Sequence, residues 1–440
     1  MRITQRFRVL LLLSTLLLVF LYSNSRKEVN SSMKEPPKRA GVRQMEVQTP
    51  VHTPVQTPIQ TPVQPSVQTP IQTPVHTSVQ IRFQTKVPTL PSVNISSTFR
   101  TLIPENGAYW NRLLHSSLKH ADQGENPLSR VPPWPDCRNT NQELIETNVQ
   151  DVDSYPLLLR NFLWGMKCRS PPFLMDQPNK CKDNTTFLLF AIKSMPAHFE
   201  RRQAVRDTWG RERLYNGGLR VRTAFLLGTA SPDDPDLSVL VRFEAEHYGD
   251  ILQADFHDSL LNLTLKMSAF LRWTLEKCPR ASFVFSGDDD VMVNTPALLS
   301  YLSSLDSSKA SRLYAGDVIK MARPQRDPKN KYFIPMSFYE GPYPAYVGGG
   351  GFVISGGLLR PLYSTCGAIP YFPIDDVYVG MCFSALGILP EAHAGFYTFD
   401  IRDRDRGNLC AYKKLILVHR RSPRQVKKIW QGIHSPLLTC

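Results

Sequence analysis

The chain has 440 residues, a formal net charge of +14 and 8 cysteines. This length could hold two or three average domains. The positive charge would suit a nucleic-acid partner, but no long basic run or nucleic-acid-binding motif accompanies it, so we expect no nucleic acid. A basic surface that faces an anionic nucleotide or acidic glycans is the remaining interpretation.

The N-terminus predicts a membrane anchor. Arg2, Arg6 and Arg8 precede an uncharged apolar run from Val9 to Tyr22. A helix over this run spans about 21 Å, short of the roughly 30 Å hydrocarbon core, and extension through Ser25 brings it closer. The positive flank predicts a cytosolic tail at 1–8 and a single-pass type II signal-anchor at 9–25. A signal peptide cleaved at Ser23-Asn24-Ser25 is the alternative, and both place the remainder in a lumen or outside the cell.

A repeat of the form [VI]-[QH]-T-P follows the anchor, over residues 47–80. Proline at every fourth position excludes helix and favours extended polyproline II, which would span on the order of 100 Å. Threonines beside prolines are typical of O-glycosylated stalks. We therefore predict a disordered stem at 26–105 that precedes a folded domain at 106–440, with an incidental repeat as the alternative.

The cysteines and glycosylation sequons agree with a lumenal address. All of the cysteines lie beyond the repeat, and their even number suits disulfides in an oxidising compartment. Eight cysteines allow 105 pairings, so the connectivity stays open. The N-x-[S/T] pattern predicts N-glycosylation at Asn30, Asn94, Asn184 and Asn262.

Short apolar strands alternate with amphipathic helices from Thr186 onward. The apolar runs predict strands at 186–194, 222–228, 250–256 and 281–290, and the segments between them predict helices at 198–210, 237–249 and 263–278. This alternation predicts an α/β domain with a mostly parallel sheet that is covered on both faces. In such sheets ligands bind at the carboxyl ends of the strands.

Three aspartates, Asp288, Asp289 and Asp290, stand at one such strand end. Like charges this close repel one another, so the pattern predicts a bound cation. Asp288 and Asp290, at alternate positions, can direct their carboxylates to one site, and oxygen ligands suit Mg²⁺ or Mn²⁺. A solvated acidic turn is the alternative interpretation.

Three further patterns are candidates for the same site. Asp375 and Asp376 could divide binding and proton transfer between them, although an acidic helix N-terminus explains many such pairs. Arg202 and Arg206 share a helix face and could hold phosphate or pair with internal carboxylates. His419 follows an apolar strand, where a lone histidine is usually structural but is also a common ligand of Mn²⁺-type ions.

A run of four glycines at 348–351 precedes an apolar strand, beside Tyr343 and Tyr346. The run lacks the Lys-Ser/Thr ending of a phosphate-binding P-loop. Glycines would let the backbone approach a ligand closely, with the tyrosines as platforms for a sugar. The alternative is a tight turn that requires positive φ.

Together these stretches resemble the β-1,3-glycosyltransferase family, and within it the β-1,3-N-acetylglucosaminyltransferases. The resemblance runs from about Asn106 to Cys440 and rests on RRQAVRDTWG, FLLGTA, YGDILQADFHDSLLNLTLK, GDDDVMVN, YPAYVGGGGFVIS, PIDDVYVG and LVHR. Galactosyltransferase relatives tend to carry Glu-Asp-Val where this chain has Asp375-Asp376-Val377. FHDSLLNLTLK and the terminal LLTC resemble the branch that extends mucin core-1 or polylactosamine chains. Met292 departs from the phenylalanine that the family often has.

The resemblance implies a GT-A fold, UDP-N-acetylglucosamine as donor, and Mn²⁺ or Mg²⁺ as cofactor. It implies that Asp376 is the general base with Asp375 beside it. It also implies that Tyr346, Gly349 and Gly350 contact the acceptor. The implied metal ligands are Asp290, Asp288 and His419. The implied contacts to the nucleotide or to metal-bound waters come from Asp288, Asp289, Arg202 and Arg206.

The activity implied by the resemblance is inverting transfer of N-acetylglucosamine to the 3-hydroxyl of a terminal galactose on glycoproteins or glycolipids. The expected address is the Golgi membrane, with the folded domain in the lumen. A β-1,3-galactosyltransferase with UDP-galactose is the nearest alternative, and a catalytically silent Golgi glycan-binding protein of the same fold is another. The acceptor and a homodimeric state stay open.

Overall fold

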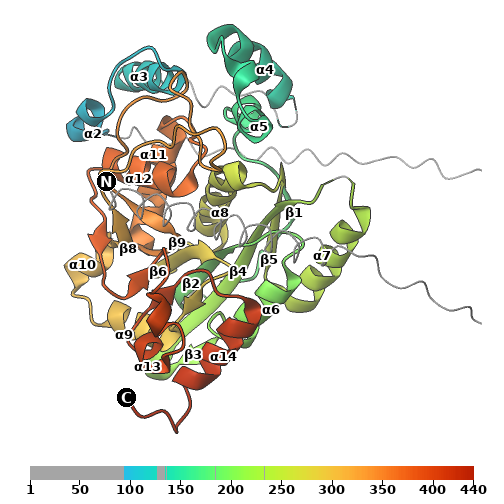
Figure 1. The fold of residues 1–440 in the computed structure, drawn as a ribbon, viewed down its shortest axis with the longest axis vertical. Coiled ribbons are helices and arrows are strands. Elements are labelled where there is room, and N and C mark those ends of the chain that lie inside the picture. Colours follow the sequence, from blue (N-terminus) through green and yellow to red (C-terminus); the bar gives the residue numbers. More distant parts are fainter. Residues whose placement is uncertain (1–93, 126–133, 135, 184, 232) are drawn as a thin grey trace, which may run out of the picture. The chain divides into compact units, whose positions relative to one another are not determined.

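The computed structural model describes residues 94–440 except 126–133, 135, 184 and 232 (Figure 1). The predicted tail at 1–8, the signal-anchor at 9–25 and the stem as far as residue 93 lie outside this range, as do Asn30 and Asn184. Within the described ranges, the structure contains no helix with the length and apolar character that a bilayer span needs.

The main sheet has nine strands among the described residues, and its four central strands are parallel in the order β5-β4-β2-β6. Towards both margins the neighbouring strands pair antiparallel, β1 with β5, β3 with β4, and β9 with β6 and β8. The sheet is therefore mixed. The prediction of a mostly parallel sheet agrees with the four central strands and with the parallel pair β8–β10, but it did not anticipate the antiparallel strands, β9 among them.

The bounds of the strands in this sheet are β1 (Phe173–Met175), β2 (Thr186–Lys193), β3 (Arg213–Tyr215), β4 (Leu219–Thr229), β5 (Ile251–His257), β6 (Phe283–Asp288), β8 (Tyr314–Ile319), β9 (Tyr346–Ser355) and β10 (Glu391–Ala392). A small second sheet joins β7 (Met292–Val293), β11 (Phe396–Tyr397) and β12 (Leu417–Val418) in the order β11-β12-β7. Its strand β7 follows the acidic turn in sequence, whereas β11 and β12 come from the C-terminal part of the chain.

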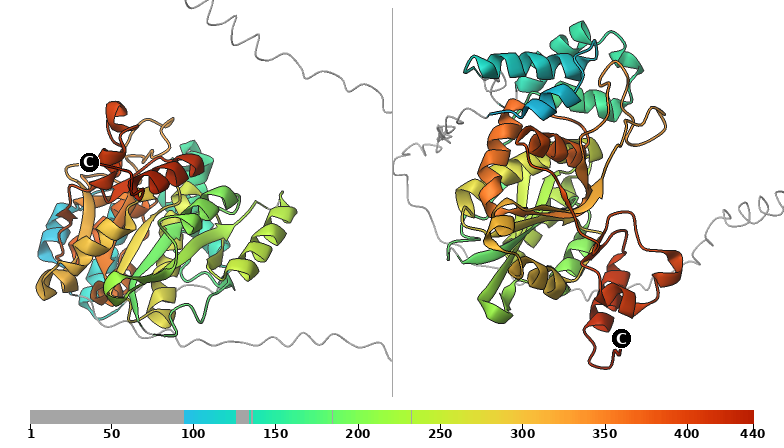
Figure 2. Two further views of the ribbon diagram at one scale, coloured as in Figure 1. Left: turned by 90° about the horizontal axis from the view of Figure 1, so that it is seen from below. Right: turned by 90° about the vertical axis from the view of Figure 1, so that its left-hand side faces the viewer.

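Helices cover both faces of the main sheet (Figures 1 and 2). They are α2 (Ser97–Leu102), α3 (Tyr109–Asp122), α4 (Cys137–Asn148), α5 (Leu157–Gly165), α6 (Phe199–Asp207), α7 (Pro235–Tyr248), α8 (Leu263–Lys277), α9 (Thr295–Ser303), α10 (Ser307–Arg312), α11 (Leu359–Ala368), α12 (Asp375–Ala385), α13 (Leu409–Lys413) and α14 (Pro423–Ile433). The strand β2 serves both covered faces, because Leu189 and Ala191 join one core and Phe190 and Ile192 the other.

Helix α2 falls inside the segment that the sequence assigned to the stem. Its Phe99 is fully buried, and the backbone N–H of Ser96 donates to the carbonyl of Ala385 at 2.8 Å. The packed part of the chain therefore includes residues before the predicted boundary at residue 106, because Ile95, Phe99 and Ile103 are buried in the core.

The strand order places a switch point between β2 and β6. From β2 the chain moves outward through β4 to β5, and then returns to the other side of β2 to form β6. A crevice forms where the crossover connections diverge in this way, outside the carboxyl ends of the strands. Lys193 at the end of β2 pairs in register with Asp288 at the end of β6. The fold thus directs attention to the edge where the three aspartates stand.

The glycine run lies inside β9, which corrects the turn interpretation. None of Gly348–Gly351 has positive φ. A Cβ at Gly348 would lie 2.5 Å from Thr398 Cγ2, and one at Gly351 would lie 2.4 Å from Leu417 Cδ1. The run therefore consists of glycine because β9 passes close beneath the second sheet.

Three disulfides join Cys137 to Cys168, Cys181 to Cys278, and Cys410 to Cys440. The prediction that cysteines pair is confirmed for these six. Cys366 and Cys382 are buried and unbonded.

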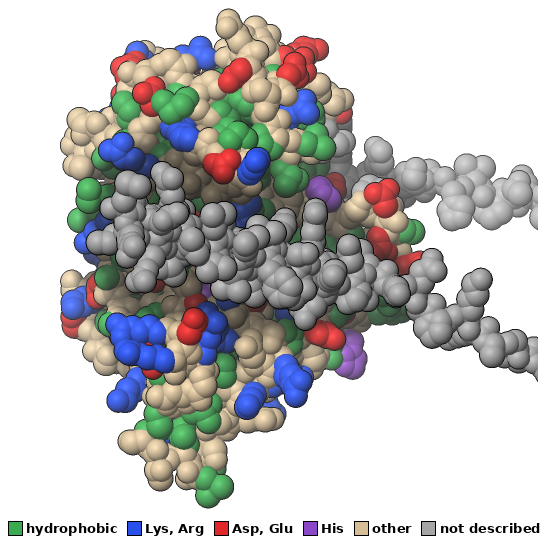
Figure 3. Space-filling model, in the orientation of Figure 1, with side chains coloured by type: hydrophobic (Ala, Val, Ile, Leu, Met, Phe, Trp, Pro, Cys, Tyr) green, Lys and Arg blue, Asp and Glu red, His purple; other side chains and the backbone are tan. Residues whose placement is uncertain are grey.

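Part of the surplus positive charge lies on the C-terminal helices. Helices α13 and α14 and the turn between them expose Lys413, Lys414, Arg424 and Lys428. Figure 3 shows Lys and Arg gathered in the lower part of the drawn face, where Figure 1 places these helices. Any attraction of a cation to the acidic turn is therefore local and opposes the net charge of the chain.

Candidate active site

The acidic turn is fixed between the two sheets. Asp288 ends β6, and the chain passes through Asp289 and Asp290 into β7. The strand β7 pairs antiparallel with β12, and the backbone N–H of Arg421 donates to the carbonyl of Asp290 at 2.7 Å. The turn is thus held from the C-terminal part of the chain as well as by its own strand.

Asp288, Asp290 and His419 form a cluster with the chemistry of a metal site. One ligand atom from each lies within 4.8 Å of the others. His419 Nε2 lies 3.1 Å from Asp290 Oδ1 and 3.7 Å from Asp288 Oδ2. The other ring nitrogen, Nδ1, lies 2.7 Å from the carbonyl of Thr398, and donation to it leaves Nε2 directed at the carboxylates. Two carboxylates and one imidazole suit Mn²⁺, and the carboxylates also suit Mg²⁺.

The electrostatics of Asp290 favour its charged form. Burial alone would raise the pKa of Asp290, but the hydrogen bond from His419 and the charges of His419 and Arg201 hold that pKa below its usual value. Asp290 therefore carries an ionised carboxylate at neutral pH, the form that a metal ion requires of an oxygen ligand.

Lys193 joins the acidic turn to the second carboxylate pair, and the sequence analysis missed it. Its Nζ lies 3.0 Å from Asp288 Oδ1 and 3.0 Å from Asp375 Oδ2, and it donates to the carbonyl of Gly349 at 3.2 Å. The two carboxylate oxygens can therefore lie no farther apart than twice 3.0 Å. Burial would lower the pKa of Lys193, but the charges of Asp288 and Asp375 raise it, so the bridge is cationic.

Asp376 begins α12 together with Asp375, as the N-terminal alternative also predicted. Its Oδ2 accepts from the backbone N–H of Gly349 at 3.0 Å, and its Oδ1 accepts from that of Val377 at 2.8 Å. Desolvation, followed by the charge of Asp375, raises the pKa of Asp376 to about 7. Asp376 is thus a carboxylate whose proton affinity suits exchange near neutral pH.

The predicted acceptor residues lie on β9 beside these carboxylates. A Cβ at Gly349 would lie 3.3 Å from Asp376 Oδ2, and a Cβ at Gly350 would lie 3.1 Å from His419 Nδ1. Tyr346 is only 9% exposed, and Tyr343 is 6% exposed. The glycines are therefore brought to the site, whereas the two tyrosine rings are mostly packed into the domain.

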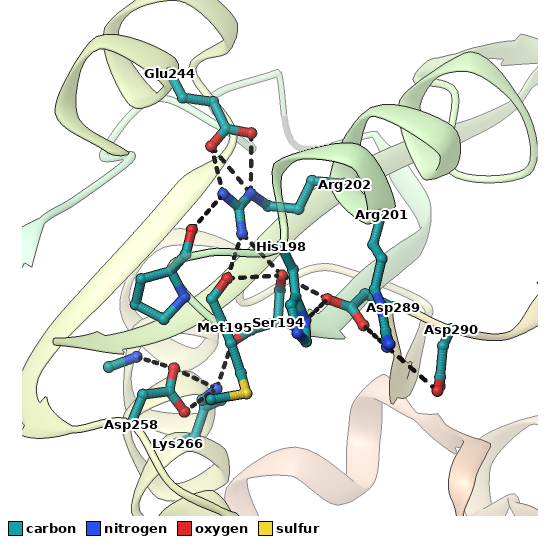
Figure 4. A network of polar contacts seen from close by, with 12 residues as sticks. Ser194, Met195, His198, Arg201, Arg202, Glu244, Asp258, Lys266, Asp289 and Asp290 are labelled. Carbon is teal, nitrogen blue, oxygen red and sulfur yellow. Dashed lines mark hydrogen bonds and ion pairs between the residues drawn. The ribbon is translucent and has the colours of Figure 1, made fainter. Parts of the chain in front are cut away.

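The side chain of Asp289 points into the protein. Its carboxylate accepts from Ser194 Oγ at 2.7 Å and from Arg201 Nη1 at 3.1 Å, and it lies 2.8 Å from His198 Nδ1 (Figure 4). Asp289 is 5% exposed. Its predicted contact with the nucleotide or with metal-bound waters has no support here, because three side chains of the protein already occupy its oxygens.

Arg202 and Arg206 are held by internal carboxylates. Arg202 is fully buried, and its Nη2 pairs with Glu244 at 2.6 Å. Arg206 pairs with Glu244 at 2.7 Å and with Asp250 at 2.7 Å. Figure 4 shows Arg202 one residue removed from Asp289, through Ser194. The geometry favours the internal ion-pair alternative, and the predicted assignment of both arginines to cofactor binding has no support.

Arg201 is the arginine that reaches the acidic turn. Its Nη1 lies 3.1 Å from Asp289 Oδ1 and 3.3 Å from Asp290 Oδ2, and its side chain is 36% exposed. Because Arg201 holds Asp290 Oδ2, the other oxygen of Asp290 faces His419. Helix spacing gave no signal for Arg201, since the i, i+4 pattern selected its neighbour.

A cavity of about 360 Å³ opens at the carboxyl ends of β4 and β5, on the same edge of the sheet. Its lining includes Trp134, Thr229, Asp255, His257 and Asn262. The Nδ2 of Asn262 donates to the carbonyl of His257 at 2.9 Å, so this predicted glycosylation site is half-buried. Asn94, in contrast, is exposed just before α2.

A family model described as Galactosyltransferase matches residues 200–393. The matched segment includes the acidic turn and the Asp375-Asp376 pair but ends before His419. Two solved structures resemble the domain weakly. A glycosyltransferase involved in glycosylation of the major capsid of PBCV-1 has 14% identity and a TM-score of 0.29, covering 56% of this chain and 98% of that one. The WbbM bifunctional enzyme has 11% identity and a TM-score of 0.32, covering 57% and 50%. At these scores neither structure carries an argument.

Curated relatives are much more similar in sequence. N-acetyllactosaminide beta-1,3-N-acetylglucosaminyltransferase 2 of Mus musculus is 49% identical over 298 residues, which are 67% of this chain and 75% of the relative. The Homo sapiens acetylgalactosaminyl-O-glycosyl-glycoprotein beta-1,3-N-acetylglucosaminyltransferase is 40% identical over 331 residues, 73% of this chain and 84% of the relative. UDP-GlcNAc:betaGal beta-1,3-N-acetylglucosaminyltransferase 7 of Rattus norvegicus is 45% identical over 291 residues, 64% and 72%.

Proposed function

Because this chain belongs to the β-1,3-N-acetylglucosaminyltransferases of the galactosyltransferase family, we propose that it moves N-acetylglucosamine from UDP-N-acetylglucosamine to the 3-hydroxyl of a terminal galactose. The product linkage is β1,3, and the acceptor is a glycan on a glycoprotein or glycolipid. Asp376 acts as the base on a GT-A type fold, and Asp288, Asp290 and His419 would hold a divalent cation that supplies positive charge for the leaving UDP.

The observation that carries this proposal is the bridge made by Lys193. Its ammonium group contacts Asp288 from the acidic turn and Asp375 from α12 at 3.0 Å each. The group that would hold the cation and the group that would bind the acceptor therefore meet at one point on the sheet edge. Transfer between two substrates requires such a meeting, since the reacting atoms must approach to about 3–3.5 Å.

The proposed cation site would stabilise the leaving group, UDP. A divalent cation bound there would neutralise the negative charge that develops on UDP as the bond to the sugar breaks. The residues of the chain prepare the site, because Arg201 and His419 each hold one oxygen of Asp290 and so fix the rotation of its carboxylate. Arg201 keeps part of its guanidinium group exposed for a phosphate oxygen. The cavity at the ends of β4 and β5 offers room for the nucleoside.

The base is Asp376, and Asp375 is its fixed neighbour. The ion pair with Lys193 holds the side chain of Asp375 in place, while the raised pKa of Asp376 makes the Asp376 carboxylate a good proton acceptor near neutral pH. The proton of the galactose 3-hydroxyl passes to Asp376 as the hydroxyl oxygen attacks the anomeric carbon. Direct displacement inverts the α-linked donor to a β product, and no covalent sugar–enzyme intermediate is required.

The absence of side chains along the glycine run makes room for the acceptor. The distance of 3.3 Å from a Cβ at Gly349 to Asp376 Oδ2 indicates that a methyl group would stand where the acceptor hydroxyl must approach the base. We place the enzyme at the Golgi membrane with a lumenal catalytic domain. The three disulfides support an oxidising compartment, and the predicted anchor supplies the attachment.

A transfer assay tests the proposal. The purified protein with Mn²⁺ is offered UDP-N-acetylglucosamine or UDP-galactose together with a panel of acceptors: lactosamine, core-1 and keratan-type glycans. We expect N-acetylglucosamine transfer and a β1,3 linkage by methylation analysis. Preference for UDP-galactose would replace the donor assignment. Binding of glycans without transfer from either donor would favour a silent glycan-binding protein.

A further inference from the structure

Two buried cysteines lie next to each other between α11 and α12, the helix that begins with the aspartate pair. Cys366 lies in α11 and Cys382 in α12, and their sulfur atoms are 2.9 Å apart. They are 3% and 0% exposed. This separation is longer than a disulfide bond of about 2.05 Å, but it is shorter than an ordinary non-bonded contact of about 3.5–4.0 Å between carbon atoms.

We propose that Cys366 and Cys382 form a fourth disulfide, which closes the α11–α12 hairpin covalently. The other six cysteines of the chain are all paired, so the fold is built under conditions that permit disulfides. The two remaining cysteines lie next to each other and not in separate parts of the domain. Neither contacts the cation site or the base, so a catalytic task does not explain them.

The surroundings hold the two sulfurs together. Tyr378 Oη donates to the carbonyl of Cys366 at 2.8 Å, and Arg169 donates to the same carbonyl through Nη1 and to that of Ile369 at 2.8 Å through Nη2. These bonds fix the C-terminal end of α11 against α12. Formation of the S–S bond therefore needs a small sulfur movement and no rearrangement of either helix.

The oxidation is a thiol–disulfide exchange. The oxidant is a disulfide, either oxidised glutathione or a protein disulfide, and its S–S bond breaks as the new one forms between Cys366 and Cys382. Both electrons pass to the oxidant, which takes up the two thiol protons and leaves as two thiols. Burial excludes the oxidant from the folded protein, so exchange occurs while the hairpin is still accessible during folding. The finished bond is then shielded from reductant.

A covalent hairpin has a consequence for the aspartate pair. The first two residues of α12 are Asp375 and Asp376, and the connection from α11 leads directly into them. Because Cys382 lies on the same helix, the bond would restrain α12 relative to α11 and so limit how far its first turn can move. This inference does not depend on which sugar the enzyme transfers.

The test begins with the unmodified full chain. The protein is denatured without reductant in the presence of an alkylating agent, and its peptides are mapped by mass spectrometry. We expect a cross-linked peptide that contains Cys366 and Cys382, and no free thiol. Alkylation of both cysteines would overturn the proposal, even if every variant failed to fold.

Two variants and their combination give a second measurement. Cys366→Ala and Cys382→Ala should each lower Tm by roughly 5 °C, and the double variant should lower it by no more than either one, because all three lose the same bond. Ser364→Ala, on the same helix, is the control for disturbance of α11 and should shift Tm little. Additive shifts in the double variant would mean two independent thiols and would contradict the bond.

Discussion

Two neighbouring clusters of charged residues are connected through Ser194, and they differ in how far their positive and negative charges cancel. In the first cluster, which we call the compensated cluster, Arg202 and Arg206 pair with Glu244 and Asp250. Two cations face two carboxylates, and every charge has its partner within the protein. Nothing in this cluster requires a ligand, and removal of one partner would leave a buried charge alone.

The second cluster, which we call the acidic cluster, is not balanced. It holds five aspartates, Asp288, Asp289, Asp290, Asp375 and Asp376, and two permanently charged cations. Lys193 contacts Asp288 and Asp375, and Arg201 contacts Asp289 and Asp290, so Asp376 has neither as a partner. The excess negative charge persists in a chain of net charge +14. The comparison shows that the candidate site is distinguished by negative charge without cationic partners in the fold, and not by the number of charged residues.

The largest effect should come from the base of the acidic cluster. Asp376→Asn should lower kcat by about 10²–10⁴-fold, because the amide cannot accept the acceptor proton. UDP binding measured by isothermal titration calorimetry with Mn²⁺ should stay near the wild-type value. Asp375→Asn is the matched control, and its main effect should be the loss of the ion pair between Asp375 and Lys193. Wild-type turnover in Asp376→Asn would remove the base assignment.

A pair of adjacent arginines separates the two clusters directly. Arg202→Met should lower the free energy of unfolding by about 3–5 kcal/mol, since it leaves Glu244 without one of its partners in a buried place. Arg201→Met, at a partly exposed site, should change stability much less and should weaken Mn²⁺-dependent UDP binding. Denaturant titration and calorimetry measure both quantities. The reverse pattern would mean that the clusters have been assigned to the wrong roles.

Removal of a cation ligand tests the acidic cluster from another side. Asp290→Ala should weaken Mn²⁺-dependent UDP binding by at least about tenfold, the size seen even for outer partners of metal sites. Asp207→Ala, in an exposed ion pair with Lys427, serves as a control for loss of a carboxylate elsewhere. Equal affinity in Asp290→Ala and wild type would count against the cation site.

The pKa of Asp376 gives a prediction in pH. An ordinary aspartate is ionised well below pH 7, but Asp376 has a pKa of about 7 and takes up a proton as the pH falls through that value. The ionised form is the base, so kcat/KM should fall about tenfold per pH unit below 7. A pH–rate profile that stays flat from pH 8 to about pH 5 would show that this group does not limit the reaction.

The smallest effect belongs to the glycine run. Gly349→Ala should raise KM for the acceptor, because the new methyl group would lie 3.3 Å from Asp376 Oδ2. The donor KM should change little. Gly357→Ala, where a Cβ would meet only Ser311 O at 3.5 Å, is the matched control. An increase confined to the donor KM would mean that the glycine run contacts the donor and not the acceptor.

The sequence predicted those features that depend on short stretches of chain. The apolar run before Asp288 located the end of a strand, and the aspartate pair, in its alternative interpretation as an acidic helix N-terminus, marked the start of α12. Both are local signals, because strand burial and helix initiation act over a few residues. The four central strands and three intervening helices were predicted within a few residues for the same reason.

The features that escaped prediction depend on contacts between distant segments. Lys193 ends an apolar strand like any polar residue, and its role arises only from the register of β2 against β6. The choice between Arg201 and Arg202 depends on the face of α6 that meets α7, where Glu244 lies. The glycines of β9 are required by Thr398, which follows β11, and by Leu417 in β12, both of which come much later in the chain.

The hydrogen bond from Arg421 to the carbonyl of Asp290 has a practical consequence for shortened versions of the protein. A fragment cut at residue 393, where the family match stops, would lose His419 and the strand β12 that borders the turn. Such a fragment would keep all five aspartates and still lack the strand that holds the acidic turn. Any minimal active piece must therefore extend through β12, and the Cys410–Cys440 disulfide argues for retaining the residues as far as Cys440.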